Sequence, residues 1–116
     1  GGDGEEKKPR NPFTSVSIRP KQSLGQNYLV DENMVGRIVD GFRAPEGDEV
    51  GRRVVEVGPG LGALTCRLFE RFPKMMAVEI DERAVEHLGE NLPGLNVLHK
   101  NVLRVDWRDV AEKRGG

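Results

Sequence analysis

The chain has 116 residues, of which 36% are hydrophobic and 32% are charged, and its formal net charge is −1 at pH 7. This length predicts at most one domain with a modest core, and the net charge by itself does not indicate a nucleic-acid partner. A single cysteine, Cys66, excludes an intramolecular disulfide framework. No apolar run reaches the roughly 20 residues of a membrane-spanning helix, so we expect no membrane association.

The first part of the chain is polar. Residues 1–19 contain prolines and several cations, and we expect them to form a flexible arm, with the folded domain spanning residues 20–116. Asp31 is placed to cap a helix whose apolar residues recur at helical spacing from Met34 to Phe42. The segment 44–52 contains one proline and two glycines and is typical of a loop.

Strands alternate with helices in the rest of the chain. Strands are predicted at 53–57, 75–80 and 95–99, and helices over about 61–72, between Asp81 and Pro93, and over 106–113. Cys66 is expected on the apolar side of the first of these helices. Such alternation is typical of an α/β fold with a parallel sheet and right-handed crossovers.

A glycine-rich turn is the most informative segment. Residues 54–62 read Val-Val-Glu-Val-Gly-Pro-Gly-Leu-Gly, which predicts a strand, a loop with Gly58, Gly60 and Gly62, and a helix N-terminus. Glycines there let the backbone approach a nucleotide-like ligand, and a carboxylate about 20 residues later, Glu79, suits the hydroxyls of a ribose. Because ligands bind beyond the carboxyl ends of parallel strands, we expect the loop, Glu79 and Asn101 to converge on one crevice.

Glu56 lies in the strand just before the glycines, and two interpretations of it remain open. It fixes the loop through hydrogen bonds to backbone N–H groups, or it is the first acid of the motif and touches no ligand.

The motifs together resemble one family. The G-x-G-x-G spacing differs from the dinucleotide fingerprint G-x-G-x-x-G and resembles the first motif of S-adenosylmethionine-dependent methyltransferases. Residues 21–29 read Lys-Gln-Ser-Leu-Gly-Gln-Asn-Tyr-Leu and resemble the K-x-S-L-G-Q-N-F-L signature of the ribosomal RNA adenine dimethyltransferases. Residues 54–62 and 77–81 resemble that family's next two motifs, in the same order and at the same spacing.

The resemblance implies a Rossmann-like class I methyltransferase fold, of which this chain is the N-terminal half, and S-adenosylmethionine as the cofactor. Asn27 and Leu29 match residues at the methionine end of the cofactor, Glu79 the ribose-binding acid, and Asn101 a residue that faces the adenine amino group. At that last position the family usually has aspartate, and an asparagine oxygen still accepts a hydrogen bond there. The full set of expected cofactor-binding residues is Gln26, Asn27, Leu29, Gly58, Gly60, Gly62, Glu79 and Asn101.

The implied activity is methylation of the exocyclic amine of adenines in small-subunit ribosomal RNA, with that RNA and a pre-ribosomal particle as partners. The family's Asn-Leu-Pro-Tyr/Phe motif, which holds the target base after the fourth strand, is not found, so no catalytic residue is assigned. We therefore expect the 116 residues alone to be inactive and the parent protein to be the enzyme, a monomer without a metal site. The compartment stays open between cytoplasm or nucleolus and an organelle, plastid or mitochondrion.

Two other function classes remain. A non-catalytic methyltransferase-like factor that binds RNA or DNA would keep the fold without the activity. An NAD-dependent oxidoreductase would use the same kind of glycine turn, but the G-x-G-x-G spacing and the segment from Gln26 to Leu29 argue against it.

Overall fold

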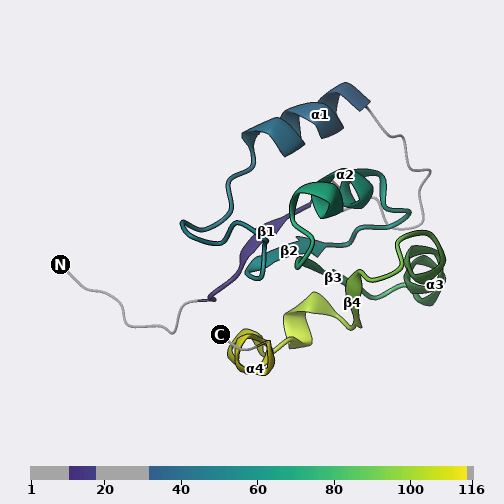
Figure 1. The fold of residues 1–116 in the computed structure, drawn as a ribbon. Helices are drawn as coiled ribbons and strands as arrows, with labels where there is room; N and C mark the ends of the chain where they lie inside the picture. The colour runs from purple at the N-terminus through teal and green to yellow at the C-terminus, as the bar shows by residue number, and fades with distance from the viewer. Residues whose placement is uncertain (1–10, 18–31, 115–116) are drawn as a thin grey trace.

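A computed structural model describes residues 11–17 and 32–114 of the chain. Its elements, in chain order, are β1 (Thr14–Val16), α1 (Glu32–Gly41), β2 (Val54–Val57), α2 (Ala63–Arg71), β3 (Met76–Glu79), α3 (Glu82–Asn91), β4 (Asn96–His99), the 3₁₀ turn η1 (Val102–Arg104) and α4 (Trp107–Lys113). The strands form one parallel sheet in the order β1-β2-β3-β4 (Figure 1). The predicted α/β fold with a parallel sheet is confirmed, and each of the three predicted strands matches to within one residue.

Strand β1 lies in the segment that we expected to be a polar arm. Thr14 pairs with Val54, and the backbone N–H of Thr14 donates to the carbonyl of Arg53 at 2.8 Å. The neighbouring Phe13 is buried, and its ring lies 5.1 Å from that of Trp107 on α4. Three residues are too few for a readable alternation pattern, so this strand depends on the edge of β2 and on the contact with α4.

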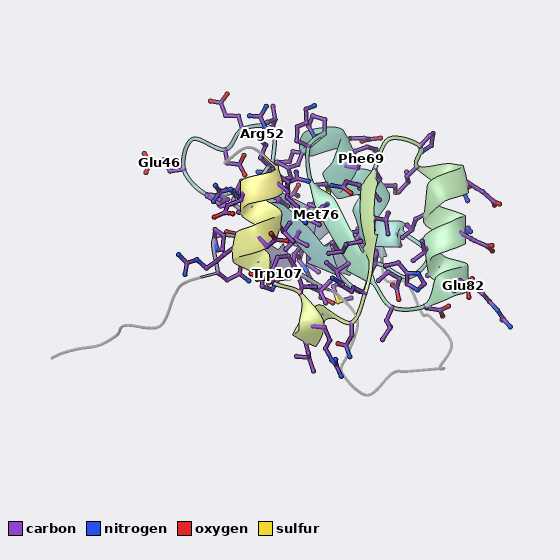
Figure 2. The ribbon with its side chains drawn as sticks, turned by 90° about the horizontal axis from the view of Figure 1, so that it is seen from below. Glu46, Arg52, Phe69, Met76, Glu82 and Trp107 are labelled. Atoms are coloured by element: carbon purple, nitrogen blue, oxygen red, sulfur yellow. The ribbon has the colours of Figure 1, made fainter. Side chains whose placement is uncertain are left out.

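The core has two halves, one on each face of the sheet. Helices α1 and α2 lie on one face, where a buried cluster consists of Val35, Val54, Leu64, Leu68, Phe72 and Met75 (Figure 1). Helix α4 covers the other face, where the buried residues are Phe13, Val55, Met76, Val78 and Ala111, with Trp107 packed against them (Figure 2). Consecutive residues of β2 point to opposite faces of the sheet, which is why Val54 and Val55 belong to different halves.

Helix α2 packs Leu64 and Leu68 into the core, but Cys66, which we expected on the same side, lies elsewhere on the helix. Leu64, Thr65 and Leu68 are its buried residues, whereas Cys66 is exposed. The prediction of Cys66 as a core residue was therefore wrong. Each step of one residue along a helix turns the side-chain direction by about 100°, so Cys66 points away from the core although the neighbouring Thr65 is buried.

Side-chain caps define the N-terminal ends of two helices. Asp81 caps α3 by accepting a hydrogen bond from the N–H of Arg83 at 2.9 Å, as predicted. Asp106 caps α4 in the same manner. Asp31, the predicted cap of α1, lies outside the described residues. No helix in the described part of the chain is long and apolar enough to cross a membrane.

Candidate functional site: a glycine loop at the carboxyl end of the sheet

The loop between β2 and α2 has three glycines in the left-handed region. Gly58, Gly60 and Gly62 have φ angles of 68°, 59° and 91°, which side chains with a Cβ rarely adopt. The N–H of Gly58 continues the sheet ladder by donating to the carbonyl of Val78 at 2.8 Å, and that of Gly62 donates to Pro59 at 3.0 Å. These glycines are therefore required by the backbone geometry of the loop itself.

Gly62 also has a packing role. It is the N-cap of α2, and a Cβ on it would lie 3.1 Å from Cδ2 of Leu88 on α3. No side chain of the described residues caps the N-terminus of α2, so the first N–H groups of this helix form a positive dipole end. Gly62 thus permits close packing of the loop against α3.

Glu79 brings the ends of two strands together, as the sequence predicts. Its Oε1 accepts a hydrogen bond from the N–H of Gly60 at 3.0 Å. Its Oε2 accepts bonds from the N–H groups of Ile80 at 3.1 Å and Asp81 at 3.0 Å. The side chain is only 1% exposed, and through the bond to Gly60 this buried carboxylate supports the glycine loop.

Asn101 follows β4, whose end lies beside that of β3. His99 pairs with Glu79 in the sheet register, and the N–H of Lys100 donates to the Glu79 carbonyl at 3.0 Å. The Asn101 side chain is exposed, and its Oδ1 accepts from the N–H of Leu103 at 2.9 Å, which caps η1. A carbonyl oxygen has two lone pairs, so the Asn101 side chain can cap this turn and accept one bond from a ligand.

Three exposed apolar side chains surround this end of the sheet, and the sequence analysis did not select them. Leu61 lies in the glycine loop and is 59% exposed, Ile80 directly follows β3 and is 58% exposed, and Leu103 in η1 is 87% exposed. Each one follows a different strand of the sheet. Large apolar residues directly after Gly60 and Glu79 were the available signal for Leu61 and Ile80, because such side chains suit the flat face of a base.

Glu56 makes a contact that neither sequence interpretation described. It is fully buried, and the hydroxyl of Thr65 in α2 donates to its Oε1 at 2.5 Å. Burial raises the pKa of Glu56 to about 7; the Thr65 hydrogen bond lowers it, and the charge of Glu79 raises it further. Among the described residues, the hydrogen-bond partner of Glu56 is therefore a side chain of α2 and not a backbone N–H group of the loop.

The remaining predicted site residues, Gln26, Asn27 and Leu29, lie outside the described residues. The tripeptide Asn91-Leu92-Pro93 shares three letters with the family's base-holding motif but connects α3 to β4, at the amino end of the sheet. It is therefore at the wrong end of the sheet to reach the glycine loop. No group of three His, Cys, Asp or Glu side chains in the described ranges could hold a metal ion.

A parallel sheet with helices on both faces, a glycine loop and a buried acid at its carboxyl edge defines an α/β domain of the Rossmann-like class. The chain belongs to the ribosomal RNA adenine dimethylase family, whose sequence model matches residues 18–114.

Relatives with the name ribosomal RNA small subunit methyltransferase A support this assignment. The chain is 49% identical to the protein of Salinibacter ruber over 102 residues, which are 88% of this chain and 33% of the relative. It is 37% identical to the protein of Alkaliphilus oremlandii over 93% of this chain and 37% of the relative. The protein of Bacillus pumilus is 44% identical over 80% of this chain and 32% of its own length. The chain thus spans about a third of the length of the curated relatives it matches.

Proposed function

We propose that the protein to which these residues belong transfers methyl groups from S-adenosylmethionine to the exocyclic amines of adenines in small-subunit ribosomal RNA. The observation that carries the proposal is the contact between Glu79 and Gly60, which joins the acid and the glycine loop at one sheet edge. Family membership and the names of the relatives support the choice of a methyl donor and of a ribosomal RNA acceptor.

The residues present fit this cofactor. Ribose hydroxyls are hydrogen-bond donors, and the Glu79 carboxylate accepts hydrogen bonds from them. These bonds form in addition to the bond from the N–H of Gly60 or replace it. The oxygen of Asn101 accepts from the adenine amine, while Leu61 and Ile80 offer apolar surface to the ring. The uncapped N-terminus of α2 favours a negatively charged group such as the carboxylate of the methionine part.

S-adenosylmethionine, when bound, supplies an activated methyl group, so the protein needs no nucleophile of its own. The work of these residues is to bind and orient the donor. Alignment of the adenine amine belongs to parts of the protein that these 116 residues do not provide, because the motif for the base is not among them.

The proposal is tested by titration of the 116-residue chain with S-adenosylmethionine, monitored by the backbone amide signals in NMR spectra. We expect the signals of Gly60, Ile80 and Leu103 to shift, and those of α4, on the far face of the sheet, to stay constant. NAD is the comparison ligand, and equal or tighter binding of NAD would contradict the methyl-donor assignment. Transfer of radiolabelled methyl groups to unmethylated small-subunit RNA by the full-length protein tests the acceptor.

A further inference from the structure

Two buried carboxyl groups lie on neighbouring strands below the glycine loop, and only one is fully hydrogen-bonded by the described residues. The oxygens of Glu79 accept three backbone N–H bonds. Glu56 has one bond, from the Thr65 hydroxyl to Oε1, and its Oε2 has no hydrogen-bond partner in the described ranges. A buried polar atom without a partner is costly, so its retention at this position needs a reason.

The position of the Glu56–Thr65 bond gives that reason. Glu56 precedes Gly58 by two residues, and Thr65 follows Gly62 by three, in the first turn of α2. Both side chains are fully buried. Glycines leave the backbone unusually free, so a loop with three of them depends on outside contacts to keep one shape. The bond joins the strand to the helix across the base of this loop.

We propose that Glu56 is a positioning residue for the glycine loop: its buried carboxyl holds Thr65, and with it the start of α2, against the end of β2. Glu79 holds the same loop at its centre through the N–H of Gly60. This inference rests on the proposed function, because it concerns the loop that receives the cofactor.

The loop is therefore sensitive to the protonation of Glu56. Its pKa is about 7 in the folded chain, against 4.5 when solvated, and the charged group that faces it among the described residues is Glu79 on β3. Between these two values the folded state binds the proton more tightly than any state that exposes Glu56 to water. The contribution of Glu56 to the stability of the closed loop is therefore fully present below about pH 4.5, and it falls as the pH rises to about 7. Above about pH 7, the equilibrium constant for opening of the loop is on the order of a hundredfold larger than at low pH.

The first test uses amide hydrogen exchange of Gly60 and Gly62 in the 116-residue chain at pH 6, without cofactor. Thr65→Val removes the hydroxyl but keeps the shape, and we expect the protection of these amides to fall about tenfold, the value of one hydrogen bond. Thr65→Ser restores the hydroxyl and should behave as wild type. Cys66→Ala, at an exposed site in the same turn of α2, and the Val85 amide in α3 are the controls. Equal protection in Thr65→Val and Thr65→Ser would overturn the proposal.

The second test is the pH profile, which decides the question even if Thr65→Val does not fold. After correction for intrinsic exchange rates, protection of Gly60 in the wild type should fall about tenfold from pH 6 to pH 8, the part of the linkage that lies around the Glu56 pKa of about 7. Glu56→Gln accepts from Thr65 but does not titrate, so its corrected protection should stay constant. Parallel profiles for the two proteins would refute the role of Glu56.

Cofactor binding separates this inference from the proposed function. If Glu56 positions the loop for the cofactor, Thr65→Val should bind S-adenosylmethionine about tenfold more weakly than Thr65→Ser. A loosened loop with unchanged affinity would reduce Glu56 to a purely structural role and overturn the inference. If the wild-type chain binds no S-adenosylmethionine, the proposed function is contradicted for this chain, while the exchange measurements still decide whether Glu56 positions the loop.

Discussion

Replacement of Glu79 by glutamine tests the central contact of the site. The carboxylate accepts N–H bonds on both sides, from Gly60 at one oxygen and from Ile80 and Asp81 at the other. Glutamine has one carbonyl oxygen, so its NH₂ group must face the N–H groups on one side. At least one buried, charge-assisted bond is lost, and each is worth about 1.5–3 kcal/mol. We therefore expect the free energy of unfolding to fall by about 2–4 kcal/mol.

The assay for Glu79→Gln is urea unfolding followed by circular dichroism at pH 6. At that pH Glu56 is mostly protonated in the folded chain, so relief of its repulsion with Glu79 does not offset the loss. The matched control is Glu86→Gln, which removes the same charge from an exposed site on α3 and should change stability by less than about 0.5 kcal/mol. Equal unfolding midpoints for the two variants would refute the claim that Glu79 holds the loop.

Glu79→Gln also separates support of the loop from binding of the ribose. Loss of the charged acceptor should weaken S-adenosylmethionine binding by about tenfold or more, measured by calorimetry at a temperature where the variant is folded. If stability falls and affinity does not, Glu79 is a structural residue, and its assignment to the ribose is wrong.

Three further substitutions test the packing and the caps that hold the site in place. Gly51→Ala should destabilise the chain by at least about 2 kcal/mol, because Gly51 has φ +85° and the new Cβ would collide with Cβ of the buried Phe72. Gly89→Ala, inside α3 with open space around it, should instead raise the midpoint of thermal unfolding through a gain of about 0.5–1 kcal/mol in helix propensity. Asp81→Ala removes the cap on the N–H of Arg83 and should cost about 1 kcal/mol in chemical unfolding, with Asp81→Asn close to wild type. Destabilisation by Gly89→Ala, or none by the other two alanine variants, would contradict the local geometry described above.

The amino-acid sequence by itself determined the strands and helices from β2 to α4 and the position of the glycine loop. The strand at Val54–Val57 and the turn after it can be predicted because an apolar run ends at a series of glycines. Glycine is the residue that readily adopts the left-handed backbone of this turn. The start of α3 is readable because Asp81 has a side chain suited to capping the helix that follows it. These signals act over a few residues, so the local sequence contains them completely.

Only the tertiary structure decided which distant groups meet. The pairing of Thr14–Val16 with β2, the burial of Thr65 in place of Cys66 and the bond between Thr65 and Glu56 have no local signature. Each depends on which surface a neighbouring element leaves uncovered after packing. The sequence therefore predicted a glycine loop and the acid Glu79 at one sheet edge and singled out Glu56, while the partner of Glu56, Thr65, became recognisable only when α2 was packed against β2.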